Sequence, residues 1–228
     1  MYNFEKVFRI ITVIQNEIKI KGIIFDVDGT LTYTNQLIFD SFNHITQKYL
    51  GKIFSDEEII KLFGPTEDII LKEICKDDYE NARNDYYNYY KNNHSIAQLY
   101  NGIKDLIVDI HSTGIRLSIF TGKGRTSALI TLDETELTDY FDLIISGDDV
   151  ENHKPDPEGI NRFIQVFNLD PKNVLMIGDA PSDIIAATKA GVEIASVVWD
   201  SYAEDEVRKL NSKNVFHSVD ELRNFIFK

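Results

Sequence analysis

The alternation of short apolar runs with helical patterns is the feature that most restricts the fold of this 228-residue chain. Segments such as Gly22–Phe25 and Val174–Ile177 are continuously apolar, which is typical of strands covered on both faces. Strands that alternate with helices along a chain form parallel sheets, because each helix carries the chain back to the same end of the sheet. The alternation therefore predicts a doubly wound, Rossmann-like α/β fold.

Strands and helices of this core are predicted along most of the chain. The strands are expected at 21–28, 116–122, 142–147, 173–179 and 192–199. The helices are expected at 126–140, 156–167, 182–189, 203–210 and 220–227. Residues 1–20 form an extension ahead of the first strand, where apolar residues at helical spacing favour a docked structural element over a signal peptide or an anchor.

One interval interrupts the alternation. From Asn35 to about Asn101 no strand-like run occurs, and four helical patterns follow one another. A capping box starts at Ser55, and the last helix, at 77–93, carries a tyrosine run that we expect to pack in a core. We therefore expect an all-helical domain at 34–101, inserted into a core domain made of residues 21–33 and 102–228.

The charge balance excludes several classes of partner. The chain has 24 Lys and Arg against 37 Asp and Glu, with a formal net charge of −13 and no basic run, which argues against nucleic acid and anionic membranes. No apolar run approaches the ~18 residues that a membrane span needs. The single cysteine, Cys75, favours a reducing compartment such as the cytoplasm. The pattern leaves monomer and homodimer open, and an anionic substrate must be attracted by a local site or a metal.

Two carboxylates follow the first predicted strand, in Phe25-Asp26-Val27-Asp28. Because strand side chains alternate, Asp26 and Asp28 start on one face, where their charges repel unless a cation or a shared proton relieves them. A calcium loop fails on spacing, because the twelfth position counted from Asp26 is Leu37 and not glutamate. A divalent metal is the favoured remedy, and a capped turn is the alternative.

A hydroxyl and an amine follow the next two strands. Thr121 and Gly122 end the strand at 116–122, and a hydroxyl beside glycine N–H groups near a helix start can hold an anion. The alternative is a strand-to-helix turn capped by Thr126. Lys154 follows the third strand and is held by the prolines around it, so it can pair with carboxylates or phosphate. A solvated lysine is the alternative.

A second carboxylate pair, Asp179 and Asp183, follows the fourth strand at a glycine turn and a helix start. Either residue could serve the helix as a cap or as a dipole partner. However, four successive strand ends carry a carboxylate pair, a hydroxyl, an amine and a further carboxylate pair at one edge of a sheet. Helix capping alone does not predict that order, so we expect a functional site there.

These segments resemble the four motifs of the haloacid dehalogenase superfamily, in the family's order. The motifs are Asp26-x-Asp28-x-Thr30, Thr121, Lys154, and Gly178-Asp179-x-x-x-Asp183. The helical insert lies where the type-one cap of that family belongs, and the resemblance runs from about residue 19 to the C-terminus. Details such as Gly147-Asp148-Asp149-Val150 look most like the phosphoglycolate phosphatase and pyrophosphatase branch.

The resemblance implies a role for each catalytic group. Asp26 would be the nucleophile that forms an aspartyl-phosphate, and Asp28 the general acid and then the general base. Thr121, Gly122 and Lys154 would hold the transferring phosphoryl oxygens. Because dehalogenases of the family lack an acid at the position of Asp28, dehalogenation is disfavoured.

The resemblance also implies a metal ion. Mg²⁺ would be held by the Asp26 carboxylate, the main-chain carbonyl of Asp28 and the Asp179 carboxylate, with Asp183 supporting these ligands from behind. The loop Gly64-Pro65-Thr66 resembles a cap loop that faces the active site in relatives, so it is a candidate specificity element.

The expected function is a Mg²⁺-dependent phosphatase of a small phosphorylated metabolite. A phosphomutase and an inorganic pyrophosphatase are alternatives within the same chemistry. A phospho-accepting signalling module and a non-enzymatic binding module are alternatives from other classes. Thr32-Tyr33-Thr34-Asn35 replaces the Val-Asp-Ser that often follows the first motif, and this departure weakens phosphoglycolate as the specific substrate.

Overall fold

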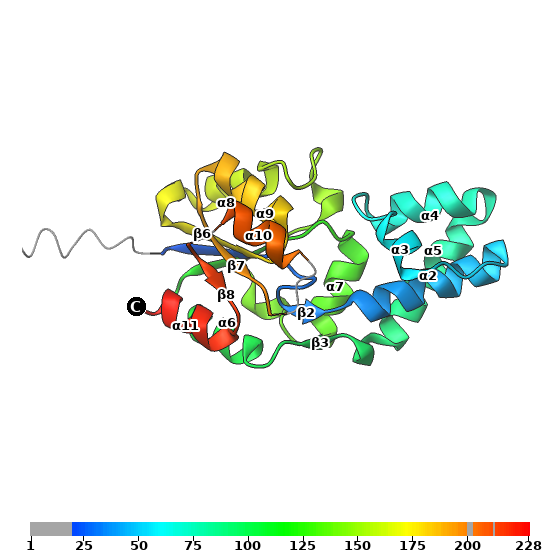
Figure 1. The fold of residues 1–228 in the computed structure, drawn as a ribbon, viewed down its shortest axis with the longest axis horizontal. Helices are drawn as coiled ribbons and strands as arrows, with labels where there is room; N and C mark the ends of the chain where they lie inside the picture. The colour runs from blue at the N-terminus through cyan, green and yellow to red at the C-terminus, as the bar shows by residue number, and fades with distance from the viewer. Residues whose placement is uncertain (1–19, 200–202, 212) are drawn as a thin grey trace, which may run out of the picture.

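The computed structural model describes residues 20–199, 203–211 and 213–228. A parallel sheet with helices on both faces forms one lobe, and a helical lobe lies at one end of it (Figure 1). The predicted α/β fold with a helical insert is confirmed. The helix proposed within residues 1–20 lies outside the described residues, apart from Ile20.

The sheet has six parallel strands in the order β5-β4-β1-β6-β7-β8. They are β1 (Gly22–Phe25), β4 (Arg116–Phe120), β5 (Leu143–Ile145), β6 (Val174–Gly178), β7 (Glu193–Val197) and β8 (Val215–Phe216). The last of these was not predicted, because two residues are too short for a hydrophobic pattern. Strand β1 lies between β4 and β6, so the loops that follow these three strands meet at one edge.

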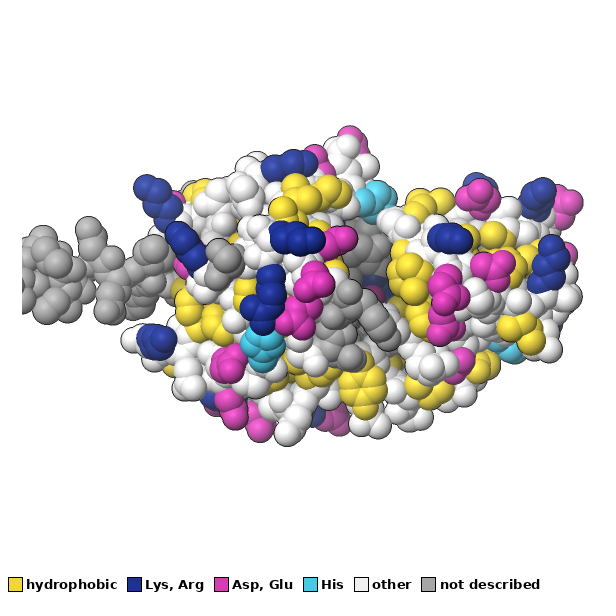
Figure 2. Space-filling view, in the orientation of Figure 1, with side chains coloured by type: hydrophobic (Ala, Val, Ile, Leu, Met, Phe, Trp, Pro, Cys, Tyr) yellow, Lys and Arg dark blue, Asp and Glu magenta, His cyan; other side chains and the backbone are white. Residues whose placement is uncertain are grey.

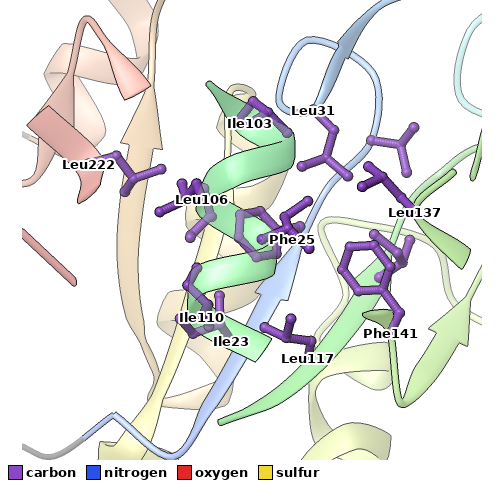
Figure 3. Packing of buried hydrophobic residues seen from close by; sticks show 14 of the residues in the cluster. Ile23, Phe25, Leu31, Ile103, Leu106, Ile110, Leu117, Leu137, Phe141 and Leu222 are labelled. Atoms are coloured by element: carbon purple, nitrogen blue, oxygen red, sulfur yellow. The ribbon is translucent and has the colours of Figure 1, made fainter. Parts of the chain in front are cut away.

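Helices cover both faces of the sheet. The first face carries α6 (Ile103–Ser112), α7 (Arg125–Glu134) and α11 (Val219–Ile226), and the second carries α8 (Glu158–Phe167) and α9 (Pro181–Ala190). Helix α10 (Glu204–Leu210) packs against α9. Side chains of β1 alternate between the two cores: Ile23 and Phe25 contact the α6 side (Figure 3), and Ile24 faces the other side. The α6 helix was not among the predicted elements.

The insert has a core of its own, built by α2 (Asn35–Leu50), α3 (Asp56–Ile60), α4 (Glu67–Cys75) and α5 (Tyr79–Asn92). Tyr86 and Tyr90 on α5 are fully buried there, with their rings stacked 6.2 Å apart. The packing role predicted for the tyrosine run is therefore confirmed. The predicted capping box is present, because Ser55 and Glu58 exchange hydrogen bonds at the start of α3.

Two predictions along the chain were wrong. A short antiparallel ribbon of β2 (Thr32–Tyr33) and β3 (Gln98–Leu99) closes the base of the insert, where no strand was expected before Asn101. The helix predicted at 126–140 begins one residue earlier and stops at Glu134. Glu136 adopts a left-handed conformation with φ of 58°, and the Leu137 N–H then donates to the carbonyl of Leu132 at 2.8 Å. That bond turns the chain out of the helix.

None of the helices in the described ranges combines the length and the hydropathy that crossing a bilayer requires.

Candidate active site

A cavity of about 250 Å³ lies between the carboxyl edge of the sheet and the helical insert. Apolar side chains of the helical lobe border the seam between the two lobes (Figure 2). The wall is built from both lobes: Asp26, Asp28, Thr121, Gly122, Lys123, His153, Lys154 and Ser182 from the core, and Asn35, Ile38, Phe42, Phe63, Gly64, Pro65, Glu67 and Ile70 from the insert. The strand-end residues Asp26, Asp28, Thr121 and Lys154 therefore share one chamber.

Asp26 directly follows β1 and is nearly buried, with a relative exposure of 7%. Its backbone N–H extends the sheet by donating to Ile177 O at 2.9 Å, which fixes where the side chain begins. The carboxylate accepts from Val27 N at 2.8 Å through Oδ1, and Oδ2 lies 3.0 Å from Lys154 Nζ. Burial, offset by Lys154 and reinforced by the charge of Asp183, raises the pKa of Asp26 to about 6. Ionising the Asp26 carboxyl in the folded protein therefore costs free energy.

Asp26, Asp179 and Asp183 form an acidic cluster in which one carboxylate oxygen of each residue lies within 4.8 Å of the other two. Burial, reinforced by the charges of Asp26 and Asp183, also raises the pKa of Asp179 well above its usual value. The Thr30 hydroxyl donates to Asp179 Oδ1 at 3.2 Å. Asp183 is fully buried, with Oδ1 2.7 Å from Lys154 Nζ. Lys154 therefore pairs with two of these three carboxylates, Asp26 and Asp183.

The donor set of this cluster fits a hard divalent cation. All three groups offer carboxylate oxygens, the ligands that such cations prefer. The raised pKa values of Asp26 and Asp179 show that one ammonium leaves the buried negative charge incompletely balanced. Asp183 Oδ1 accepts from Lys154 Nζ, and Asp183 Oδ2 accepts from the Ala180 N–H at 3.1 Å. This geometry suits a residue that supports the metal ligands from behind.

Lys154 and Thr121 lie on the loops after β5 and β4, both on the same side of Asp26 in the strand order. The Lys154 side chain is 6% exposed, and although burial opposes its charge, Asp183 and Asp26 together hold its pKa above the usual value. Thr121 is buried directly after β4, and its Oγ1 accepts from Lys123 N at 3.3 Å. Together with Gly122, these two side chains give the chamber a cation, a hydroxyl and open backbone beside Asp26.

Asp28 is half-buried and has partners separate from those of Asp26. Its Oδ1 accepts from the Thr34 hydroxyl, and its Oδ2 lies 3.1 Å from Lys123 Nζ. The mutual repulsion expected for Asp26 and Asp28 is therefore relieved by two different lysines. Between Asp28 and the cluster, Gly29 has φ of 77°, and a Cβ placed there would lie 2.3 Å from Asp179 Oδ2. Only glycine fits this turn.

Lys123 and Glu67 are the site residues that the sequence did not reveal. Lys123 is buried with its Nζ 3.6 Å from Glu67 Oε1 and 5.1 Å from the centre of the Tyr90 ring. Glu67 accepts from Gly124 N at 2.6 Å and from Ser127 Oγ at 2.5 Å. In the sequence Lys123 stands in a glycine turn, where the ordinary interpretation is a solvated lysine. Glu67 stands in the first turn of a helix, where the ordinary interpretation is a carboxylate that stabilises the helix dipole. Neither pattern signals their contact.

Comparisons with known proteins agree with this geometry. Residues 23–197 match the model of the haloacid dehalogenase-like hydrolases. A pyrophosphatase PpaX from Halalkalibacterium halodurans is 31% identical over 91% of this chain and 97% of its own length. A pyrophosphatase PpaX from Bacillus thuringiensis is 30% identical over 79% of this chain and 84% of its own. The structure of a haloacid dehalogenase-like family hydrolase from Streptococcus pneumoniae superposes with a TM-score of 0.71, at 26% identity, over 92% and 99% of the two chains.

Proposed function

Because the chain belongs to the haloacid dehalogenase-like hydrolase family, we propose that it is a Mg²⁺-dependent phosphatase of a small phosphorylated metabolite that works through an aspartyl-phosphate on Asp26. One observation carries the proposal. Asp26 stands buried at the end of the central strand, 3.0 Å from Lys154 and within the acidic cluster, on the wall of a chamber closed by the insert. A cavity of about 250 Å³ suits a small substrate.

In the first step an Asp26 oxygen attacks the phosphorus atom, and the bond from phosphorus to the leaving oxygen breaks. Asp28, protonated at that stage, gives its proton to the leaving oxygen. In the second step Asp28 takes a proton from water, which attacks the aspartyl-phosphate and releases phosphate and the free Asp26 carboxylate. A carboxylate nucleophile divides a difficult transfer into two easier ones, and a placed acid and base contribute about 10²–10⁴-fold.

The groups around Asp26 bind and orient the phosphoryl group. Lys154 supplies a positive charge, the Thr121 hydroxyl supplies a hydrogen bond, and the Gly122 backbone supplies space for a close approach. The insert covers the chamber and excludes water that would compete with the leaving group.

The residues that would hold Mg²⁺ are the Asp26 carboxylate, the main-chain carbonyl of Asp28 and the Asp179 carboxylate, with Asp183 behind them. When bound, the ion supplies positive charge to the phosphoryl oxygens. The buried negative charge of the cluster supports this assignment.

Inorganic pyrophosphatase activity is the second candidate, because the two relatives described above are named pyrophosphatase PpaX, at 31% and 30% identity. Pyrophosphate differs from a metabolite ester in having a charged phosphate as its leaving group. We further propose that the enzyme works in the cytoplasm as a monomer or homodimer, with no nucleic-acid or membrane partner.

The test is phosphate release from a panel of phosphorylated metabolites and pyrophosphate, with Mg²⁺ and with chelator. Asp26→Asn is the inactive variant, and Asp139→Asn, an exposed aspartate outside the chamber, is the matched control. We expect metal-dependent release that Asp26→Asn abolishes and Asp139→Asn retains.

Other outcomes identify the alternatives. Rapid transfer to a sugar phosphate with little phosphate release indicates a phosphomutase, and stable phosphorylation without turnover indicates a phospho-accepting module. No release or transfer from any compound, with the protein folded and Mg²⁺ bound, overturns the proposal in favour of a binding module.

A further inference from the structure

Two lysine side chains line the chamber, and they lie beside different carboxylates. Among the described residues, Lys123 and Lys154 are the only lysine or arginine side chains that line it. Lys154 lies between Asp26 and Asp183, beside the reacting carboxylate. Lys123 lies beside Asp28, the proposed acid for the leaving oxygen, so it is the cation nearest to the leaving group.

Lys123 is already paired on two sides. Its side chain is 1% exposed, with Nζ 3.1 Å from Asp28 Oδ2 and 3.6 Å from Glu67 Oε1. Lys123 is therefore already paired with the Glu67 carboxylate and, when Asp28 is ionised, with Asp28 as well. Burial opposes the charge of Lys123, but Asp28, Tyr90 and Glu67 together hold its pKa above the usual value.

The second of these carboxylates comes from the insert and is firmly held. Glu67 opens α4, and its side chain is 8% exposed. It accepts from the backbone N–H of Gly124 at 2.6 Å and from the Ser127 hydroxyl at 2.5 Å, both at the start of α7. With two strong bonds to α7 besides the lysine, the carboxylate has little freedom to leave when a substrate enters.

The rest of the leaving-group side is apolar. The insert contributes aliphatic and aromatic side chains to that wall, namely Ile38, Phe42, Phe63 and Ile70. A second anionic group on the substrate would find no unpaired lysine or arginine on the described wall and would approach the Glu67 carboxylate. Like charges brought together in a partly dry site disfavour binding. The remaining titratable group is the His153 imidazole, whose Nδ1 is buried without a partner.

Resting on the proposed function, we infer that Glu67 is a specificity-determining residue that restricts the enzyme to phosphomonoesters whose leaving group carries no second anionic group. An alcohol with hydroxyl or apolar substituents meets the apolar wall without an unpaired charge. A leaving group with a carboxylate or a phosphate is repelled by Glu67, which also neutralises Lys123. Inorganic pyrophosphate and 2-phosphoglycolate belong to the repelled class.

The experiment compares substrates that differ only in that charge. 2-Hydroxyethyl phosphate and 2-phosphoglycolate share a two-carbon leaving group and differ by a hydroxyl against a carboxylate, and pyrophosphate is added as a third substrate. The kcat/KM of each is measured with Mg²⁺ at pH 8, where imidazoles are ordinarily neutral. We expect the wild type to favour 2-hydroxyethyl phosphate by at least about tenfold, which corresponds to ~1.4 kcal/mol.

Glu67→Gln is the informative variant because it removes the charge and preserves the shape. The amide oxygen can accept from Gly124 N–H, and the amide NH₂ can donate to Ser127 Oγ, whose hydrogen is then free to turn to Gly124 O at 3.2 Å. We expect it to shift the ratio about tenfold toward 2-phosphoglycolate, chiefly through a lower KM. Glu73→Gln removes the same charge from an exposed position on α4 and is expected to leave the ratio unchanged.

A double variant tests whether Lys123 binds the second anionic group once Glu67 is neutral. If the released Lys123 binds the second anion, adding Lys123→Met to Glu67→Gln abolishes the gain in 2-phosphoglycolate activity. The inference is overturned if the wild type uses 2-phosphoglycolate or pyrophosphate as well as 2-hydroxyethyl phosphate, or if Glu67→Gln leaves the ratio unchanged. Either result leaves the phosphatase itself intact. Failure of the wild type to hydrolyse any phosphorylated compound overturns the proposed function instead.

Discussion

Replacing Asp26 with asparagine is expected to stabilise the metal-free protein at neutral and alkaline pH, although it removes the reactive oxygen. Asp26 is 7% exposed and lies within the acidic cluster, and burial together with nearby carboxylates raises its pKa from 3.8 to about 6 despite Lys154. Asparagine carries no charge and can still accept from Lys154, but its NH₂ then replaces the oxygen that accepts from Val27 N. The substitution therefore removes a cost of ionisation and keeps one of the two hydrogen bonds.

The size of the effect follows from proton linkage. A folded pKa of about 6 against 3.8 unfolded means that the native state binds the proton more tightly, so the free energy of unfolding falls as the pH rises through this range. The full penalty above pH 7 is about 3 kcal/mol, at 1.36 kcal/mol per pKa unit. Roughly half of this develops between pH 5 and pH 8, which corresponds to a change of about 3–6 °C in Tm.

The assay is urea unfolding and thermal unfolding of the wild type and Asp26→Asn in chelator, at pH 5 and at pH 8. Asp139→Asn controls for the loss of one negative charge elsewhere. We expect the advantage of Asp26→Asn over the wild type to grow with pH, and the Asp139→Asn variant to follow the wild type. Mg²⁺ at 1,000 times its Kd is expected to reverse the order, since a cation that binds only the folded wild type then adds about 4.1 kcal/mol, which exceeds the penalty of about 3 kcal/mol.

The same pH dependence for the wild type and Asp26→Asn would refute this reasoning, because it would mean that the Asp26 carboxylate ionises at no cost. A wild type that Mg²⁺ stabilises no more than Asp26→Asn would refute the assignment of the cluster to a cation.

Two further substitutions test the geometry of the site. Gly29→Ala is expected to lower Mg²⁺ affinity and activity by at least about tenfold, because the new Cβ would lie 2.3 Å from Asp179 Oδ2 in a backbone with φ of 77°. Gly51→Ala controls for backbone strain, since Gly51 has φ of 65° and no atom within 4 Å of its Cβ position. Equal Mg²⁺ affinity of the two variants, measured by calorimetry, would contradict the account. Lys154→Ala is expected to lower the free energy of unfolding in urea by about 3–5 kcal/mol, because it leaves buried carboxylates unpaired. Lys172→Ala, at an exposed position, is expected to lower it by less than about 0.5 kcal/mol. Similar values for the two variants would contradict the pairing of Lys154.

The sheet and the residues at its carboxyl edge were predictable because their signals are local. A strand such as Gly22–Phe25 is continuously apolar, and the polar residue that ends it, Asp26, marks the edge. Parallel strands place all such residues at the same end, so Asp26, Thr121, Lys154 and Asp179 could be grouped before their distances were known. The structure brings them to one chamber or to the cluster beside it.

The contacts between the insert and the core could not be predicted in this way. Glu67 and Lys123 meet only when the insert folds over the sheet edge, and each has an ordinary local interpretation in the sequence. The same reason applies to the ribbon in which Thr32 pairs with Leu99, since two-residue strands have no period and depend on a distant partner. Gly64 and Pro65 of the loop Gly64-Pro65-Thr66 line the chamber, and Glu67 follows them directly. The role of this loop in specificity stays a prediction.

The central claim is that Asp26 carries the phosphoryl group during turnover. The most direct measurement is to mix the enzyme and Mg²⁺ with an excess of substrate, quench with acid within the first turnover, and map the phosphorylated peptide by mass spectrometry. We predict one hydroxylamine-labile phosphoryl group on Asp26, formed and lost at rates that account for kcat, and absent from Asp26→Asn. Turnover without a labelled Asp26, or a label on another carboxylate, would contradict the account.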